Sequence, residues 1–180
     1  MTYFSAYYDS PLGRIMLGAQ GEKLVGLWLE GQKYFADTVD GEFVENPDLP
    51  ILSSAAKWLD AYFAGKKPVI SSLALAPQGS AFRQQVWRIL CDIPYGQYLS
   101  YGEIARKIAA RTGRKSMSGR AVGGAVGHNP ISIIIPCHRV VGSGGSLTGY
   151  SGGIRKKIKL LELEGVDMSG FFIPGTGTAL

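Results

Sequence analysis

The stretch SYGEIARKIAARTGRKSMSGRAVGGAVGHNP, residues 100–130, decides the fold of the second half of the chain. Ser100 and Glu103 form the S-x-x-E pattern of a capping box, which predicts that a helix begins directly after Ser100. A second short helix is predicted over 119–128, and Pro130 stops it. Two short helices joined by a basic loop favour a helix-turn-helix-like motif, although this loop is longer than the usual turn of about three or four residues.

Further helices are predicted on both sides of this motif. Residues 80–94, SAFRQQVWRILCDIP, carry apolar residues at helical spacing behind Ser80, a good N-cap residue. Cys91 falls inside that helix, which favours a buried structural thiol. Residues 151–165, SGGIRKKIKLLELEG, form an amphipathic pattern that ends at Gly165. Its expected inward positions are Ile154, Ile158 and Leu161.

The first part of the chain has a different character. Three short strands with turn residues between them predict an antiparallel meander. They cover residues 3–8, 14–19 and 24–30. Residues 51–67, ILSSAAKWLDAYFAGKK, place apolar side chains on one helical stripe. We therefore predict an α+β protein, with a small antiparallel-sheet-plus-helix domain over 1–75 and a mostly helical domain over 76–180.

Charge separates the two halves of the chain. Of the 180 residues, 19 are Lys or Arg and 14 are Asp or Glu, which gives a net charge of +5. Residues 1–80 carry a net charge of −3 and residues 81–180 carry +8, which indicates a surface for a polyanion in the second half. A solvated basic face without a partner is the alternative.

The sequence carries no sign of a membrane or of an oxidising compartment. No segment has the length and hydropathy of a membrane span, and the start MTYFSAYYDS lacks the features of a secretory leader. We therefore expect a cytoplasmic protein, or a nuclear one if the source is a eukaryote. The chain has two cysteines, so a disulfide framework is not expected.

The stretch SIIIPCHRVVG, residues 132–142, places a cysteine and a histidine side by side after three isoleucines that we expect in the core. Cys137 attacks only as a thiolate, so a nucleophilic role needs a neighbour that lowers its pKa below the usual value of about 8.5. His138 is the nearest candidate, but adjacent residues of an extended chain point to opposite faces, which favours a relay through one water molecule. The acid that would orient His138 is left open between Glu162 and Glu164.

Several alternatives stay open for Cys137 and His138. Packing and surface exposure account for most such pairs. A conventional cysteine hydrolase would use Cys137, His138 and an acid, whereas a DNA-binding module would carry an inert thiol. A zinc site is disfavoured, because the two Cys and two His residues of the chain lack metal-ligand spacing. Arg120 starts a glycine-rich predicted helix, where a cation opposes the helix dipole, so an outward-reaching role competes with that of an ordinary surface arginine.

Four motifs in one order resemble the O6-alkylguanine–DNA alkyltransferase family. They are RAVGGA, an NP pair whose Asn is eight residues before Cys137, PCHRVV and YSGG, and the resemblance runs from about Phe82 to Val166. Residues 1–75 resemble the family only in length and coarse pattern. The resemblance implies a ribonuclease H-like first domain and a winged-helix-like second domain. It also implies direct-reversal DNA repair, in which one molecule irreversibly takes one alkyl (methyl) group from O6 of guanine, and possibly O4 of thymine, onto Cys137, without cofactor or metal.

The resemblance assigns roles at the site of alkyl transfer. Cys137 is the acceptor, and His138 and Glu164 activate it through a water molecule. Asn129 ties the helix-turn-helix to the active-site loop, and Tyr101 donates a proton toward O6 of guanine. On this basis we expect the Cys137 thiol to titrate well below about 8.5. The implied substrate pocket consists of Ser132, Val140 (through its carbonyl), Tyr150, Ser151 and Gly152.

The implied partner is double-stranded DNA that contains O6-alkylguanine, bound through its minor groove by a monomer. Arg120 would fill the hole left by the flipped-out base. The first 80 residues contain no Cys or His and so lack the zinc ligands of some relatives. Ser132 stands where some relatives have a proline, which puts the tolerance for bulky alkyl groups in question. The other implied DNA-binding residues are Ser100, Arg114, Lys115, Ala121, Gly124 and Ala125.

Overall fold

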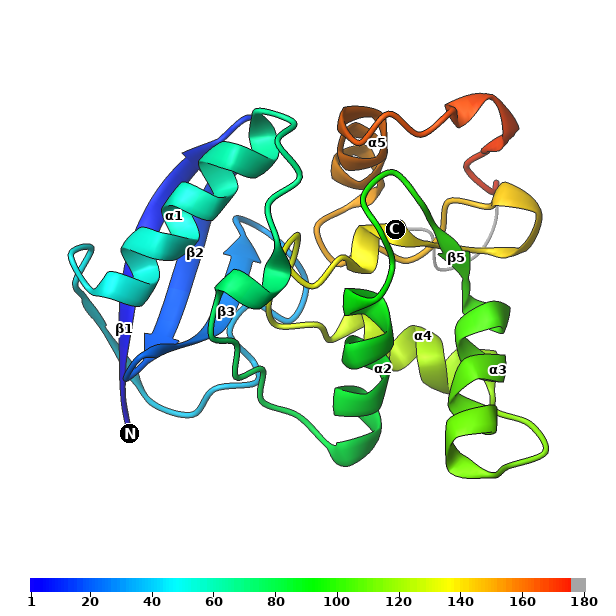
Figure 1. The fold of residues 1–180 in the computed structure, drawn as a ribbon, viewed down its shortest axis with the longest axis horizontal. Coiled ribbons are helices and arrows are strands. Elements are labelled where there is room, and N and C mark those ends of the chain that lie inside the picture. Colours follow the sequence, from blue (N-terminus) through cyan, green and yellow to red (C-terminus); the bar gives the residue numbers. More distant parts are fainter. Residues whose placement is uncertain (176–180) are drawn as a thin grey trace. The chain divides into compact units, whose positions relative to one another are not determined.

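The structure, a computed structural model, describes residues 1–175 and divides into two compact units (Figure 1). The first comprises Met1–Gly79 with Pro130–Ile134, and the second comprises Ser80–Asn129 with the chain from Ile135 onward. The division after Gly79 lies four residues beyond the predicted one, and the sequence assigns Pro130–Ile134 to the other domain. The predicted α+β class is confirmed, with a sheet in the first unit and mostly helices in the second.

A four-stranded sheet with the order β3-β2-β1-β4 forms the first unit. Its strands are β1 (Thr2–Ser10), β2 (Gly13–Gln20), β3 (Lys23–Leu29) and β4 (Glu42–Glu45). The predicted meander is confirmed, because β1 pairs antiparallel with β2 and β2 with β3. The sequence does not predict β4, which runs parallel to β1 and makes the sheet mixed rather than antiparallel throughout. Its four residues include one half-buried side chain, too little for a recognisable strand pattern.

Helix α1 (Pro50–Phe63) packs along this sheet (Figure 1). Pro50 suits the first turn, where its missing N–H would have had no partner within the helix. The inward side chains of α1 are buried, and the rings of Trp58 and Tyr62 stack 5.5 Å apart. A 3-10 turn, η1 (Ile70–Ser72), follows, and the chain then rejoins β3, where Leu24 donates its N–H to the carbonyl of Ala74 at 2.9 Å. Burial of the apolar face of α1 against the sheet stabilises the unit.

The segment Pro130–Ile134 is hydrogen-bonded to β3. The N–H of Leu27 donates to the carbonyl of Pro130 at 2.9 Å, and the N–H of Ser132 donates to the carbonyl of Leu27 at 3.0 Å. Ile133 has a φ of 69°, in the left-handed region that β-branched residues rarely adopt, and such a conformation costs about 1–3 kcal/mol. The surrounding contacts supply that energy, since the three isoleucines at 133–135 are buried as predicted.

Three helices form the body of the second unit: α2 (Ala81–Cys91), α3 (Tyr101–Thr112) and α4 (Gly119–Gly127). Each begins behind a serine whose hydroxyl accepts a hydrogen bond from the first turn. The predicted capping box is confirmed, because Ser100 Oγ accepts from the N–H of Glu103 at 3.1 Å and Glu103 Oε2 accepts from the N–H of Ser100 at 2.7 Å. Cys91 ends α2 and is partly exposed, so the prediction of a buried thiol there is wrong.

Short elements and one further helix complete the second unit. They are β5 (Leu99–Ser100), η2 (Cys137–Arg139), β6 (Val140–Val141), η3 (Ser143–Gly145), α5 (Ile154–Leu163) and η4 (Met168–Gly170). β5 and β6 pair in parallel. On α5, Leu161 is buried as predicted, but Ile154 and Ile158 are half-buried, whereas Lys157 and Leu160 are buried. None of the helices among residues 1–175 has the length and hydropathy required to cross a membrane.

Candidate active site

Cys137 opens the turn η2 with 2% of its surface exposed. The Asn129 side chain donates a hydrogen bond to its sulfur, and the backbone N–H groups of Cys137 and His138 lie near enough to lower the pKa of the thiol. Asn129 Nδ2 further donates to the carbonyl of Ile135 at 2.8 Å, which fixes the amide between the end of α4 and the chain before Cys137. The Asn129 amide and these two N–H groups favour negative charge on the sulfur.

Burial is nevertheless the strongest influence on the Cys137 thiol, and it raises the pKa of that thiol. The Asn129 hydrogen bond, the ammonium group of Lys157 and the two backbone N–H groups act in the opposite direction. The expectation that the thiol titrates well below about 8.5 is therefore wrong, because burial disfavours the thiolate more than these neighbours favour it.

The His138 ring is oriented by Glu164. His138 Nε2 lies 2.6 Å from Glu164 Oε1, and both side chains are fully buried. Burial raises the pKa of Glu164, but the hydrogen bonds from His138 and Arg139 outweigh it and hold that pKa well below its usual range. An ionised carboxylate can only accept, so Nε2 carries the proton and Nδ1 is the basic nitrogen of the neutral ring. Burial lowers the pKa of His138 against the opposing influence of Glu164, which favours this neutral form.

Arg139, for which the sequence suggests no role, completes the support of Glu164. Its Nε donates to Glu164 Oε2 at 2.8 Å and its Nη2 to Oε1 at 2.8 Å, while Nη1 donates to the carbonyl of Ile93 at 2.6 Å. The N–H of Gly96 adds a further bond to Oε2 at 3.0 Å. Glu162, the other candidate acid, is exposed on α5. Glu164 is therefore the acid that orients His138.

Two tyrosines lie near Cys137. The hydroxyl of Tyr101 is 3.1 Å from the carbonyl of Thr148 and 3.2 Å from that of Gly149. The hydroxyl of Tyr150 is buried and has no hydrogen-bond partner within residues 1–175. Burial and then the proximity of Cys137 raise the pKa of both phenols, so both remain protonated donors at neutral pH.

Lys157 is the second charged residue that the sequence does not reveal. Its side chain has no exposed surface, and its Nζ donates to the carbonyls of Val140 and Thr148, the latter at 3.0 Å. The Thr148 carbonyl is the one that also lies beside the Tyr101 hydroxyl. A buried ammonium next to a cysteine supplies positive charge where a thiolate would form.

Comparison with known proteins agrees with this geometry. A family model described as "6-O-methylguanine DNA methyltransferase, DNA binding domain" matches residues 81–166, and one described as "6-O-methylguanine DNA methyltransferase, ribonuclease-like domain" matches residues 3–77. A methylated-DNA–protein-cysteine methyltransferase of Mycobacterium bovis is 46% identical over 156 residues, which are 87% of this chain and 88% of the relative. The chain belongs to the 6-O-methylguanine DNA methyltransferase family.

Further relatives of this family extend over nearly the whole chain. A Haemophilus influenzae methylated-DNA–protein-cysteine methyltransferase is 38% identical over 161 residues, 89% of this chain and 86% of the relative. The crystal structure of Mycobacterium tuberculosis OGT in complex with DNA has a TM-score of 0.77 and 42% identity, covering 95% of each chain. The family predicted from the motifs around Cys137 is confirmed, as is the ribonuclease-like character of the first domain.

The predicted DNA-binding residues of α4 do not all lie on one face. Arg120, Ala121 and Gly124 are exposed. Ala125, in contrast, has 3% of its surface exposed and lies on the inner face of the helix, where its carbonyl accepts a hydrogen bond from Trp87 Nε1 at 2.8 Å. The prediction that Ala125 contacts DNA therefore does not hold, because packing against α2 already occupies it.

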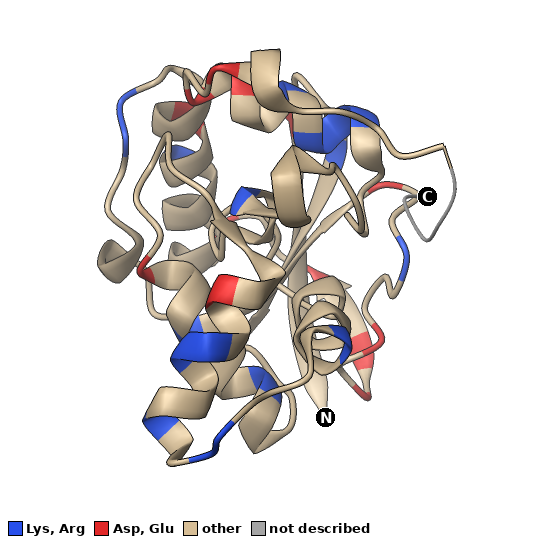
Figure 2. Cartoon of the chain, turned by 90° about the vertical axis from the view of Figure 1, so that its right-hand side faces the viewer, with Lys and Arg blue, Asp and Glu red and all other residues tan. Residues whose placement is uncertain are grey.

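The remaining basic residues cluster beside α3. Arg106, Arg114 and Lys115 line a groove of about 500 Å³ between α3 and the loop that follows it. From residue 104 to residue 161 the chain carries 11 Lys or Arg and no Asp or Glu, so these cations have few acidic neighbours in the sequence (Figure 2). Ser100, the last of the predicted DNA-binding residues, is half-buried, and its hydroxyl is used as the cap of α3.

The predicted pocket residues divide between the two units. Tyr150 is buried, Ser151 and Gly152 are half-buried in the turn before α5, and Val140 follows η2 directly. Ser132 belongs to the first unit, where its fully buried hydroxyl lies 3.4 Å from Gln32 Oε1. The contacts of Ser132 are thus with the β3 side of its own unit.

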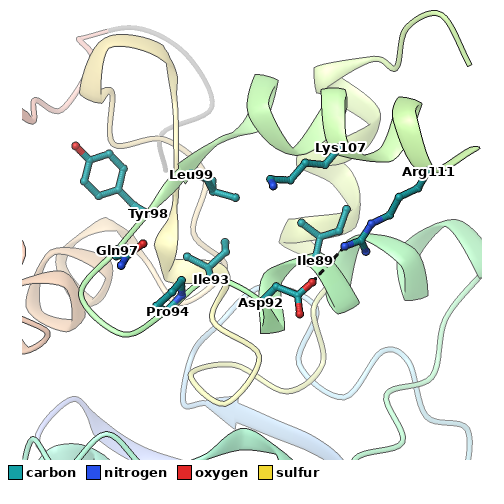
Figure 3. A pocket seen from close by; sticks show the side chains of 9 residues that line it. All are labelled: Ile89, Asp92, Ile93, Pro94, Gln97, Tyr98, Leu99, Lys107 and Arg111. Atoms are coloured by element: carbon teal, nitrogen blue, oxygen red, sulfur yellow. Dashed lines mark hydrogen bonds and ion pairs between the residues drawn. The ribbon is translucent and has the colours of Figure 1, made fainter.

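A separate cavity of about 230 Å³ opens in the second unit (Figure 3). Apolar side chains from α2 and the loop after it line one wall, and Lys107 of α3 projects toward it from the other. An ion pair between Arg111 and Asp92, 3.3 Å long, lies at its edge. None of the predicted site residues lines this cavity. Within residues 1–175 no cluster of His, Cys, Asp and Glu side chains is suited to a metal ion.

Proposed function

We propose that this protein repairs alkylated DNA by direct reversal, with Cys137 as the acceptor of the alkyl group. The chain belongs to a family named for 6-O-methylguanine DNA methyltransferase activity, and its curated relatives are methylated-DNA–protein-cysteine methyltransferases. The observation that carries the assignment to Cys137 is its surroundings: a buried sulfur hydrogen-bonded by Asn129, directly followed in the chain by a histidine whose imidazole a buried carboxylate orients. At Cys91 the carboxylate of Asp92 adds to the effect of burial, and together they raise the pKa of that thiol to about 11.

The reaction is a displacement at the alkyl carbon. The sulfur of Cys137 forms a bond to this carbon while the bond from the carbon to O6 of guanine breaks, and the bonding pair stays on the guanine. The proton that leaves the thiol is taken up by the guanine, so the products are S-alkylcysteine and an unmodified base. A thioether has no hydrolysable bond, so each molecule reacts once.

Two groups would move the proton. His138 Nδ1, the basic nitrogen of the neutral ring, would accept it from the thiol through a water molecule. Glu164 would stabilise the imidazolium that results. Tyr101 would donate toward O6 of the departing guanine, a role that suits a phenol kept protonated by burial.

Double-stranded DNA is the proposed partner, bound through its minor groove by a monomer. A base inside a duplex cannot reach a buried sulfur, so the alkylated nucleotide must leave the stack. Arg120 is exposed at the start of α4 and would take its place, with Ala121 and Gly124 allowing the helix to approach closely. Arg114 and Lys115 would hold phosphates along their groove. The site of action would be the cytoplasm, or the nucleus of a eukaryote.

The flipped base would lie among Tyr101, Val140, Tyr150, Ser151 and Gly152. The buried Tyr150 hydroxyl, which has no partner within residues 1–175, is a donor available to a bound base. Methyl is the proposed alkyl group, and O4 of thymine is a second proposed donor.

Mass spectrometry of the protein after incubation with an O6-methylguanine oligonucleotide tests this function. We expect one methyl per chain, carried by the peptide that contains residue 137, and no further gain with excess DNA. The Cys137→Ser variant should bind DNA but gain no methyl. Repeated turnover would favour a cysteine hydrolase, and an unmodified wild-type protein that binds DNA tightly would favour a binding module.

A further inference from the structure

Lys157 is fully buried in the second unit, which is unusual for a lysine. Removing an ammonium from water is unfavourable unless other groups compensate for the lost hydration. Two backbone carbonyls, of Val140 and Thr148, accept hydrogen bonds from its Nζ. No Asp or Glu within residues 1–175 forms an ion pair with it, because the acidic partners of the described ion pairs are Asp92 and Glu164, bound to other residues.

Lys157 carries its charge on the buried face of α5. Lys157, Leu160, Leu161 and Glu164 are buried and follow the i, i+3, i+4, i+7 spacing of one helical stripe. Arg155 and Lys159 lie on the outer side of the same helix. A leucine or methionine at 157 would fill the inner face without a charge, so packing alone does not explain a lysine there.

The charges around the site leave Lys157 as the cation next to the sulfur. Glu164 is balanced by Arg139, whose guanidinium donates to both of its oxygens, and His138 is neutral. Tyr101 from α3 and Tyr150 from the loop before α5 face the same sulfur as neutral phenols. Burial lowers the pKa of Lys157 to about 8, and Cys137 acts against that lowering. The influence is mutual, because Lys157 also lowers the pKa of Cys137.

The two carbonyls that Lys157 holds belong to different parts of the site. Val140 follows Cys137 by three residues, and Thr148 precedes Tyr150 by two. The Thr148 carbonyl also accepts a hydrogen bond from the Tyr101 hydroxyl at 3.1 Å. One ammonium thus connects the chain after the nucleophile to the loop that carries the proposed pocket residues.

We propose that Lys157 is a positioning residue of the alkyl-transfer site. Its ammonium fixes the Val140 and Thr148 carbonyls and supplies the positive charge that stabilises the Cys137 thiolate until the alkyl group is transferred. The proposal rests on the proposed function of Cys137. The ammonium of Lys157 on α5 would act electrostatically on the sulfur itself, in addition to the orientation of His138 by Glu164 at the end of the helix.

The test is the pH dependence of Cys137 labelling by iodoacetamide, a small neutral reagent, in a Cys91→Ser background so that one thiol is followed. In Lys157→Met we expect the midpoint of the labelling rate to move upward by about one pH unit or more, because an opposite charge beside the thiolate is lost. Lys157→Arg keeps the charge and should stay near the parent midpoint. Lys159→Met, a change on the outer side of α5, is the matched control and should leave it unchanged.

The outcomes separate this proposal from the proposed function. An unchanged midpoint in a folded Lys157→Met protein, judged by its thermal melt, would overturn the electrostatic role and leave Lys157 a packing residue. If Lys157→Met does not fold, Lys157→Gln gives the same comparison, since its amide still donates to a carbonyl but carries no charge. Methyl transfer from an O6-methylguanine oligonucleotide to the parent protein is measured in parallel, and its failure would reject the function without affecting the labelling result.

Discussion

Glu164 Oε1 lies 2.6 Å from His138 Nε2, and neither side chain has any exposed surface. The same carboxylate accepts hydrogen bonds from Nε and Nη2 of Arg139 and from the N–H of Gly96. One anion therefore neutralises a buried guanidinium and orients a buried imidazole. Its structural contribution and its chemical contribution can be measured separately.

Replacing Glu164 by Gln should reduce both stability and reactivity. Arg139 would lose its carboxylate, and removing one partner of a buried ion pair costs about 3–5 kcal/mol. We expect this loss in the free energy of unfolding, measured by urea denaturation, and methyl transfer slowed by about a hundredfold or more in the folded variant. Glu162→Gln, an exposed change nearby on α5, should alter neither. A wild-type transfer rate in Glu164→Gln would remove Glu164 from the mechanism.

Much of the fold can be predicted from local patterns. Ser100 and Glu103 place the start of α3 to the residue, and the first three strands follow from alternation between turn residues. Strand β4 is short and mostly exposed, so its own residues do not reveal it, and its partner is distant in the sequence. From the sequence, the segment 130–134 is predicted to belong to the second domain. Its place in the first unit depends on hydrogen bonds with β3, which its own composition does not reveal.

The candidate site can be predicted where motifs define it, but not where burial defines it. The motif order points to Cys137, His138 and Glu164, and the structure joins Glu164 to His138, the residue after Cys137, by a hydrogen bond. Lys157 lies in the basic stretch IRKKIK and Arg139 carries a charge, both of which ordinarily predict solvent exposure, so nothing local reveals that the two are buried. Small residues are ambiguous for the opposite reason. The small side chain of Ala125 would allow a close approach to DNA, and it would equally fit in the protein core. The structure places it in the core.

Replacing Asn129 by Ala should raise the thiol pKa of Cys137 further. The change removes a donor to the sulfur and takes a donor from the buried carbonyl of Ile135. Loss of a buried hydrogen-bond partner costs about 1–3 kcal/mol, which urea denaturation would measure. The pKa follows from the pH dependence of iodoacetamide labelling, with His128→Ala, next to it and half-buried, as the control. A profile identical to that of the parent would show that the amide does not act on the sulfur.

Replacing Arg120 by Ala should separate base flipping from chemistry at the sulfur. The side chain is exposed, so the free energy of unfolding should change by less than about 0.5 kcal/mol. Because unstacking a base costs a few kcal/mol, repair of O6-methylguanine in duplex DNA should slow by about tenfold or more. Labelling by free O6-benzylguanine needs no flipping and should keep its rate. Arg111→Ala removes a positive charge from the same unit and controls for charge alone. If Arg120→Ala slowed the reactions with duplex DNA and with free O6-benzylguanine equally, Arg120 would not act by filling the hole left by the flipped-out base.

Replacing Cys137 by Ser should make stability rise with pH between about 8 and 10.5. Burial lowers the pKa of Lys157 from 10.5 to about 8, and the variant lacks the sulfur that acts in the opposite direction. Between these values the unfolded chain binds a proton that the folded chain does not, so the free energy of unfolding increases with pH, by about 3 kcal/mol over the window. Urea denaturation at several pH values measures this rise relative to Cys137→Ser/Lys157→Met, in which the tyrosines titrate equally. No difference between the two variants would mean that Lys157 keeps an ordinary pKa despite its burial.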